Sequence, residues 1–152
     1  MENKTPQGIT ENKLFHILGV ARKCYELAKS KGWSEEYSRR MFMLGWCHDI
    51  GYEFELSPFH GIISADLIDK AFNKKESIIA EHGNPDLDIS DEEAYILNVA
   101  DILVGPDGKE CTAEYRIEEI KSRYGECSQQ YKNAIMLAKK LKLIEWKIAS
   151  WL

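Results

Sequence analysis

The sequence predicts an all-α protein, a single bundle of about six to seven helices. Two observations carry this prediction. Apolar residues recur at steps of three and four along most of the chain, which is the period of a helix with one buried face. No segment alternates apolar and polar residues regularly enough to form a strand. The 152 residues are enough for one domain with its own core, so we expect a single domain over residues 1–152.

The first two helices have clear boundaries in the sequence. A helix is expected from Lys13 to Lys31, and Gly32 should end it. Ser34 is a suitable N-cap for a second helix that runs to about Asp49, where Gly51 stops it. The buried face of the first helix is expected to contain Leu14, Ile17, Leu18, Ala21, Cys24, Tyr25 and Ala28.

The remaining helices are separated by loops rich in glycine, proline and aspartate. Ser90 and Glu93 have the spacing of a capping box, so a helix should begin there and run to about Val104. The stretches GNPDLDIS and GPDGKE on either side of it are expected to be loops. The other helices are expected at His60–Ala71, Glu76–His82, Ala113–Arg123 and Gln129–Trp151.

Composition and charge exclude several classes of protein. The chain has 20 lysines and arginines against 25 aspartates and glutamates, a net charge of −5, which argues against general nucleic-acid binding. No apolar run is long enough to span a membrane, and the N-terminal residues do not form a signal peptide, so we expect a cytoplasmic protein. The four cysteines contain no CxxC pair and are expected to be reduced thiols.

The C-terminal segment differs from the rest in charge. Residues 128–152 carry five lysines and one glutamate, on an amphipathic pattern. Such a helix can bind a membrane surface or a partner. More amphipathic helices simply pack on their own domain or on a second subunit, and we favour that interpretation.

The chemistry of the sequence is concentrated in its histidines and two aspartates. All four histidines lie on or beside a predicted helix and have apolar neighbours, and His48 is followed directly by Asp49. Asp101 shares an apolar stripe with Leu97 and Val104, where a carboxylate must be paired, neutralised or bound to a cation. Singly, each of these residues is more often structural than functional. Together, imidazole and carboxylate groups suit transition metals, and six of them suit two ions that share a carboxylate. The six candidates are His16, His48, Asp49, His60, His82 and Asp101.

The order H…HD…H…H…D resembles the HD-domain superfamily of metal-dependent phosphohydrolases. The stretches FHILGVARKCYELAKSKG, LGWCHDIGY, FHGIISADLI, IIAEHG and LNVADILVGPDGK carry the resemblance over residues 13–109, which would form the HD core, followed by C-terminal helices over about 112–151. The pattern is most similar to the branch that contains bacterial dinucleoside tetraphosphatases and HD-GYP phosphodiesterases. The resemblance implies that His16, His48, Asp49 and Asp101 hold one metal. Asp49 would bridge to a second metal, which His60 and His82 would complete.

These expectations define a candidate reaction. The cofactor would be one or two divalent ions of iron, manganese, cobalt, nickel or zinc, with magnesium also open. A hydroxide between the metals, oriented by the catalytic Asp49, would attack the phosphorus of a nucleotide or another small phosphorylated molecule. Lys109 and Arg116 are the candidates for substrate binding. Two alternatives stay open: a di-iron oxygenase with the same ligands, and a non-catalytic nucleotide- or metal-binding module. No membrane partner is expected, and a homodimer is left open.

Overall fold

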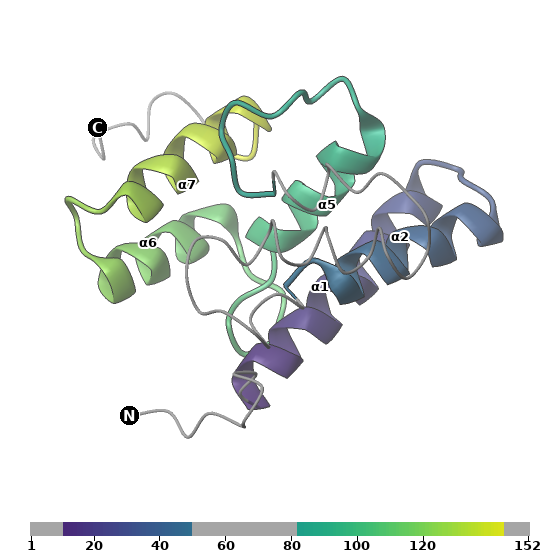
Figure 1. Ribbon diagram of the computed structural model, residues 1–152, viewed down its shortest axis with the longest axis horizontal. Coiled ribbons are helices and arrows are strands. Elements are labelled where there is room, and N and C mark those ends of the chain that lie inside the picture. The colour runs from purple at the N-terminus through teal and green to yellow at the C-terminus, as the bar shows by residue number, and fades with distance from the viewer. Residues whose placement is uncertain (1–10, 50–81, 145–152) are drawn as a thin grey trace.

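The computed structural model describes residues 11–49 and 82–144, which are all-α (Figure 1). Their five helices are α1 (Glu11–Ser30), α2 (Glu35–Cys47), α5 (Glu92–Ile102), α6 (Ala113–Tyr124) and α7 (Gln129–Lys140). Within these ranges the only β-type pairing is an isolated bridge between Val104 and Glu110. The predicted fold class is confirmed. The helix predicted at His60–Ala71 lies outside the described residues, and so does the helix predicted at Glu76–His82 except for its last residue, His82.

Helices α1 and α2 form a hairpin whose turn follows from the sequence. Gly32 has a φ of +81°, a left-handed conformation that glycine adopts without steric cost. The backbone N–H groups of Gly32 and Trp33 donate to the carbonyls of Lys29 and Ala28 and close the end of α1. The Ser34 side chain then accepts from the Tyr37 N–H and caps α2, as predicted. Because the connection is this short, the beginning of α1 lies beside the end of α2.

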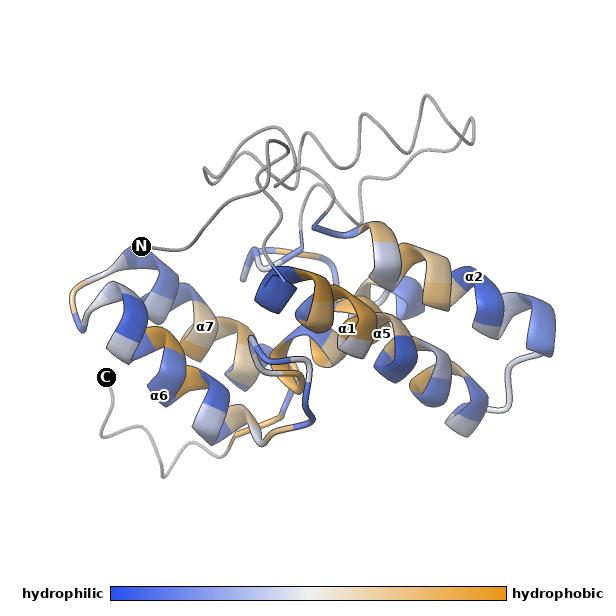
Figure 2. Ribbon diagram, turned by 90° about the horizontal axis from the view of Figure 1, so that it is seen from below, coloured by the Kyte–Doolittle hydropathy of each residue, from blue (hydrophilic) through white to orange (hydrophobic). Residues whose placement is uncertain are grey.

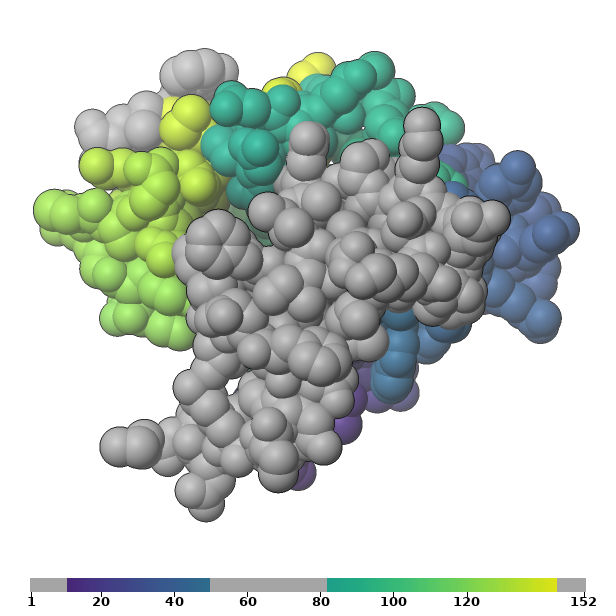
Figure 3. Space-filling model, viewed as in Figure 1, coloured from purple at the N-terminus to yellow at the C-terminus, as the bar shows by residue number. Residues whose placement is uncertain are grey.

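Helix α5 lies at the centre of the described structure. Most of its residues are buried, because it contributes to two apolar clusters at once. One cluster joins α5 to the α1–α2 hairpin through residues such as Val20, Met41 and Leu97. The other joins α5 to α6 and α7 through residues such as Ile117 and Ile135. In Figure 2 the apolar residues of α6 and α7 lie where these helices face one another, and Figure 3 shows α2 and the α6–α7 pair at opposite ends of the molecule.

Two helix ends form in a different way from the sequence prediction, whereas the other described boundaries agree with it to within two residues. The N-cap of α5 is Asp91, whose side chain accepts from the N–H groups of Glu93 and Ala94, whereas Ser90 bonds to Asp88 instead. Helix α7 ends at Lys140, earlier than the predicted end at Trp151; residues 145–151 of the predicted range lie outside the described residues.

The end of α7 has a physical cause that the sequence conceals. Lys142 adopts a φ of +59°, and its N–H donates to the Lys139 carbonyl. The Leu143 N–H donates to the Ala138 carbonyl, which completes the same type of turn that Gly32 forms at the end of α1. Up to Ile144, the apolar residues of this basic segment other than the exposed Met136 pack in the second cluster, so the favoured interpretation of packing on the domain holds for its described part.

Two further expectations concern cysteines and membranes. Cys24 and Cys47 are buried, and all four cysteines are free thiols. None of the helices in the described ranges combines the length and the apolar character needed to cross a membrane. The single-domain assignment over residues 1–152 stays a prediction.

Candidate metal centre

Histidines and aspartates from four parts of the chain meet beside the α1–α2 hairpin. His16 lies near the beginning of α1, and His48 caps the end of α2 with Asp49 directly after it. The hairpin brings these three residues together, because the beginning of α1 lies against the end of α2. Asp101 comes from the last turn of α5, and His82 precedes the loop that leads to this helix. The candidate centre therefore depends on the packing of α5 against the hairpin.

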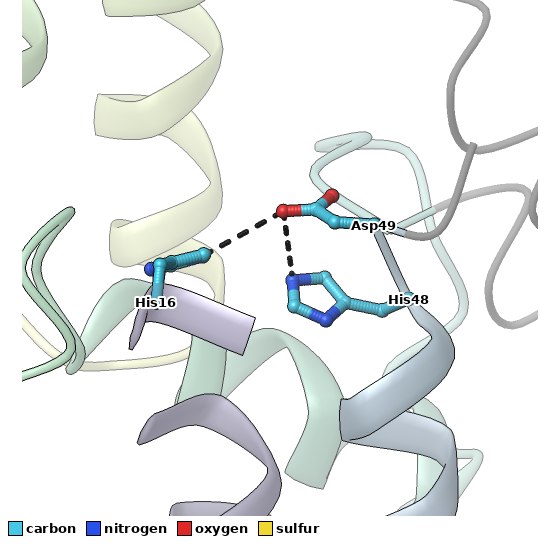
Figure 4. Close-up of side chains that lie close together, drawn as sticks. All are labelled: His16, His48 and Asp49. Carbon is cyan, nitrogen blue, oxygen red and sulfur yellow. Dashed lines mark ion pairs between the residues drawn. The ribbon is translucent and has the colours of Figure 1, made fainter. Parts of the chain in front are cut away.

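The side-chain nitrogens and oxygens in this cluster lie within a few ångströms of one another. His16 Nε2 is 2.9 Å from Asp101 Oδ1, and His48 Nε2 is 3.4 Å from the same oxygen. Figure 4 shows how His16 and His48 both face Asp49, whose Oδ2 is 3.8 Å from His16 Nε2 and 3.2 Å from His48 Nε2. His16, His48 and Asp49 are almost completely buried, with exposed fractions of 2%, 0% and 4%.

The two oxygens of Asp49 face different histidines. Oδ2 is the oxygen near His16 and His48, whereas Oδ1 lies 3.2 Å from Nε2 of His82. Two groups of potential metal ligands can be defined by ligand atoms that all lie within 4.8 Å of one another. The first contains His16, His48 and Asp49, and the second contains His48, His82 and Asp101. A carboxylate whose oxygens face different histidines is suited to bridging two cations.

Backbone carbonyls orient two of the histidine rings. His16 Nδ1 is 3.0 Å from the Gly105 carbonyl oxygen, and His48 Nδ1 bonds to the Gly45 carbonyl oxygen. A carbonyl accepts only, so each Nδ1 carries a hydrogen, and in the neutral ring Nε2 keeps its lone pair. A metal-binding histidine commonly donates its other ring N–H in this way.

His48 shows most clearly that the residues fit a cation. Its Nε2 is fully buried and has no hydrogen-bond partner in the described part of the chain. A buried polar atom without a partner is costly, and here it faces two carboxylates. A transition-metal ion bound to this nitrogen and to those oxygens would satisfy all three groups.

The charges of the cluster also favour a cation. Burial by itself would lower the pKa of His48, but the negative charges of Asp49 and Asp101 outweigh it and raise this pKa to about 10. Burial would raise the pKa of Asp101, but the adjacent His16 and His48 hold it well below its usual range. Without a metal, the two carboxylates therefore attract a proton to His48, and a divalent cation can take that place.

The loop after Asp101 fits closely against α1 and fixes the carbonyl that orients His16. Gly108 has a φ of +80°, and a Cβ there would lie only 2.2 Å from the Phe15 carbonyl oxygen. A Cβ on Gly19 would lie 2.4 Å from the Gly108 carbonyl oxygen. These two glycines allow the backbones to approach, and Gly105 is thereby brought to His16.

Sequence reasoning missed two side chains at the centre. Lys13 Nζ lies 3.5 Å from Asp49 Oδ2. Asn98, which is 1% exposed, accepts a hydrogen bond of 2.8 Å from the N–H of Gly83, the residue after His82. Lys13 could have been found because it precedes His16 by three residues and so lies on the same side of the helix. Asn98 could have been suspected as an amide on an apolar stripe three residues before Asp101.

The structure brings together five of the six predicted ligands: His16, His48, Asp49, His82 and Asp101. His60 lies outside the described residues. The proposed substrate-binding residues are placed differently. The Lys109 side chain is exposed, and Arg116 is buried with its Nη1 2.6 Å from Glu119 Oε2. The roles of all these residues stay predictions.

Comparison with known proteins points to one family. The family model of the HD domain matches residues 14–104, and this range includes all six candidate ligands, from His16 to Asp101. No curated protein and no solved structure gave a match.

Proposed function

The chain belongs to the HD domain family, and we propose that it is a metal-dependent phosphohydrolase with two metal ions. HD domains bind divalent metals, and the cluster of His16, His48, Asp49, His82 and Asp101 supplies candidate ligands for them. The observation that carries the proposal is the buried Nε2 of His48, which faces two carboxylates and has no hydrogen-bond partner among the described residues.

The number of ions follows from Asp49. We propose that Oδ2 of Asp49 binds the first metal with His16, His48 and Asp101, and that Oδ1 binds the second metal with His82. The separation of the two oxygens toward different histidines supports this arrangement. His60 would complete the ligands of the second metal, as the resemblance to the branch with dinucleoside tetraphosphatases and HD-GYP phosphodiesterases implies.

The reaction we propose is the hydrolysis of a phosphoester or phosphoanhydride bond in a nucleotide or another small phosphorylated molecule. Bound cations would lower the pKa of a water molecule and neutralise the phosphoryl oxygens. The chain itself would hold the ligands in place through the carbonyls of Gly45 and Gly105. Asp49 is 4% exposed, so its carboxylate would be held in a fixed position away from bulk water, where it would orient the attacking hydroxide.

The test has two steps. Protein purified without added metal is analysed for bound metals, and each of Mn²⁺, Fe²⁺, Co²⁺, Ni²⁺, Zn²⁺ and Mg²⁺ is then restored before assay on a panel of phosphoesters. We expect anaerobic release of phosphate that depends on metal and that His48→Ala and Asp49→Ala abolish. Glu118→Ala, an exposed acid on α6, should keep wild-type activity.

The alternatives predict other results. Turnover that requires oxygen, without phosphate release, would identify the oxygenase. Metal uptake without turnover on any substrate would favour the binding module. Phosphate release at the wild-type rate by Asp49→Ala would show that the proposed mechanism is wrong.

A further inference from the structure

Lys13 is a positive charge at the edge of the candidate metal centre. It lies on α1, three residues before His16, and its Nζ is 3.5 Å from Asp49 Oδ2. The Lys13 side chain is 23% exposed, whereas that of Asp49 is 5% exposed. The lysine is therefore more accessible to solvent than the candidate ligand that it contacts.

The position of this charge is unfavourable for metal binding alone. Asp49 Oδ2 is also the oxygen that faces His16 and His48, so a cation bound there would lie close to the ammonium group of Lys13. Like charges at such a distance repel each other, and Lys13 would therefore weaken the binding of the metal. An anion between the two positive charges would reverse the sign of this interaction.

A phosphoryl group is such an anion. Its oxygens carry negative charge and accept hydrogen bonds, and lysine is a common phosphate-binding residue that acts as a point charge. We propose that Lys13 binds the phosphoryl group of the substrate and moves from Asp49 to a phosphoryl oxygen when metal and substrate are bound. This inference rests on the proposed hydrolase function and assigns a specific substrate contact within it.

The residues predicted earlier for this contact are less suitable. The guanidinium of Arg116 is already neutralised by Glu119 at 2.6 Å. The Lys109 side chain is exposed, and its backbone N–H and carbonyl are used within the loop that follows Asp101. Lys13 is the residue for which the structure gives a direct contact with a candidate metal ligand.

The test compares Lys13→Met and Lys13→Arg with a matched control on the same helix. Lys23 has a side chain that is 21% exposed and pairs with Glu110 at 2.8 Å, so Lys23→Met removes a similar ion pair away from the metal ligands. Two quantities are measured on the full chain by calorimetry. They are the affinity for Mn²⁺ alone and the affinity of the Mn²⁺-loaded protein for inorganic phosphate. Steady-state kinetics on an active phosphoester then separates KM from kcat.

We expect Lys13→Met to weaken phosphate binding about tenfold to a hundredfold, which corresponds to the loss of one hydrogen bond to a charged group. Its Mn²⁺ affinity should be unchanged or higher, because a repelling charge is gone. Lys13→Arg should restore most of the phosphate affinity, and Lys23→Met should change neither quantity. KM should rise in Lys13→Met.

Three outcomes would overturn the inference. The first is a phosphate affinity of Lys13→Met equal to that of the wild type. The second is a fall of tenfold or more in its Mn²⁺ affinity, which would mean that Lys13 only holds Asp49 in place. The third is a failure of the Mn²⁺-loaded wild type to bind phosphate. If the wild type hydrolyses a phosphoester and Lys13→Met binds phosphate normally, only this inference fails. If no substrate is hydrolysed, the proposed function fails independently of the phosphate titration.

Discussion

The buried amide of Asn98 supports the candidate metal centre through a hydrogen bond with Gly83. Asn98 lies on α5, three residues before Asp101, and its Nδ2 donates to the Ala94 carbonyl at 2.8 Å. Its Oδ1 accepts from the Gly83 N–H, also at 2.8 Å. Because Gly83 follows His82, this bond ties the backbone at one candidate ligand to the helix that carries another. We predict that Asn98→Ala lowers both the stability of the chain and its metal affinity.

The magnitude follows from the burial of the bond. Asn98 is 1% exposed, so its removal leaves the Gly83 N–H without its protein partner. Asn98→Ala removes this bond and the one to the Ala94 carbonyl, and each contributes about 0.5–1.5 kcal/mol, so the expected loss is about 1–3 kcal/mol. For a domain of this size, that loss lowers Tm by about 2–12 °C. Loss of a group that supports a metal ligand typically weakens metal binding by about 10- to 100-fold.

The assay separates stability from metal binding. Urea denaturation in the presence of a chelator gives the free energy of unfolding without metal, and titration with Mn²⁺ gives the affinity. Asn133→Ala is the matched control. Asn133 Oδ1 accepts from Gln129 Nε2 at 2.7 Å on an exposed helix face, and its loss should change stability by no more than about 0.5 kcal/mol. The reasoning is refuted if Asn98→Ala and Asn133→Ala have the same stability and the same Mn²⁺ affinity.

Three further predictions address the loop, the end of α7 and the metal. Gly19→Ala would force the backbone at Gly108 outward and with it the Gly105 carbonyl that orients His16. It should lower stability by about 1–3 kcal/mol and metal affinity by about tenfold or more, and a normal Mn²⁺ titration would contradict this. Lys142→Gly should raise the free energy of unfolding by about 0.5–1 kcal/mol, because glycine adopts the φ of +59° without strain; urea midpoints test it, and a lower midpoint would count against it. Metal present at about 100 times its Kd should stabilise the protein by about 2.7 kcal/mol, so EDTA should lower Tm in calorimetry, and an unchanged Tm would argue against a metal bound to the folded chain.

The helix boundaries show which local signals a sequence reveals. Gly32 and Ser34 are residue types that directly favour the conformations found there, so the end of α1 and the start of α2 could be predicted. Lys142 forms the same type of helix end as Gly32, but a lysine gives no such signal, and the helical periodicity continues past it. At α5, Ser90 and Asp91 are both good caps, and only the backbone geometry selects Asp91.

The candidate centre also has features that residue types reveal and features that depend on packing. Five of its ligands could be predicted because histidine and aspartate carry the groups that bind a metal, and their order is visible in the sequence. The carbonyls that orient the histidines could not be predicted, because they are backbone atoms that no residue type reveals. The Gly105 carbonyl reaches His16 across 89 residues of chain, and it does so only because Gly19 and Gly108 let two backbones touch. Lys13 and Asn98 act on residues 36 and 15 positions away, at distances that depend on how α1, α2 and α5 pack. Residue types thus indicate what a centre can bind, whereas the contacts that set the orientation and charge of its ligands arise from packing and have to be read from the folded chain.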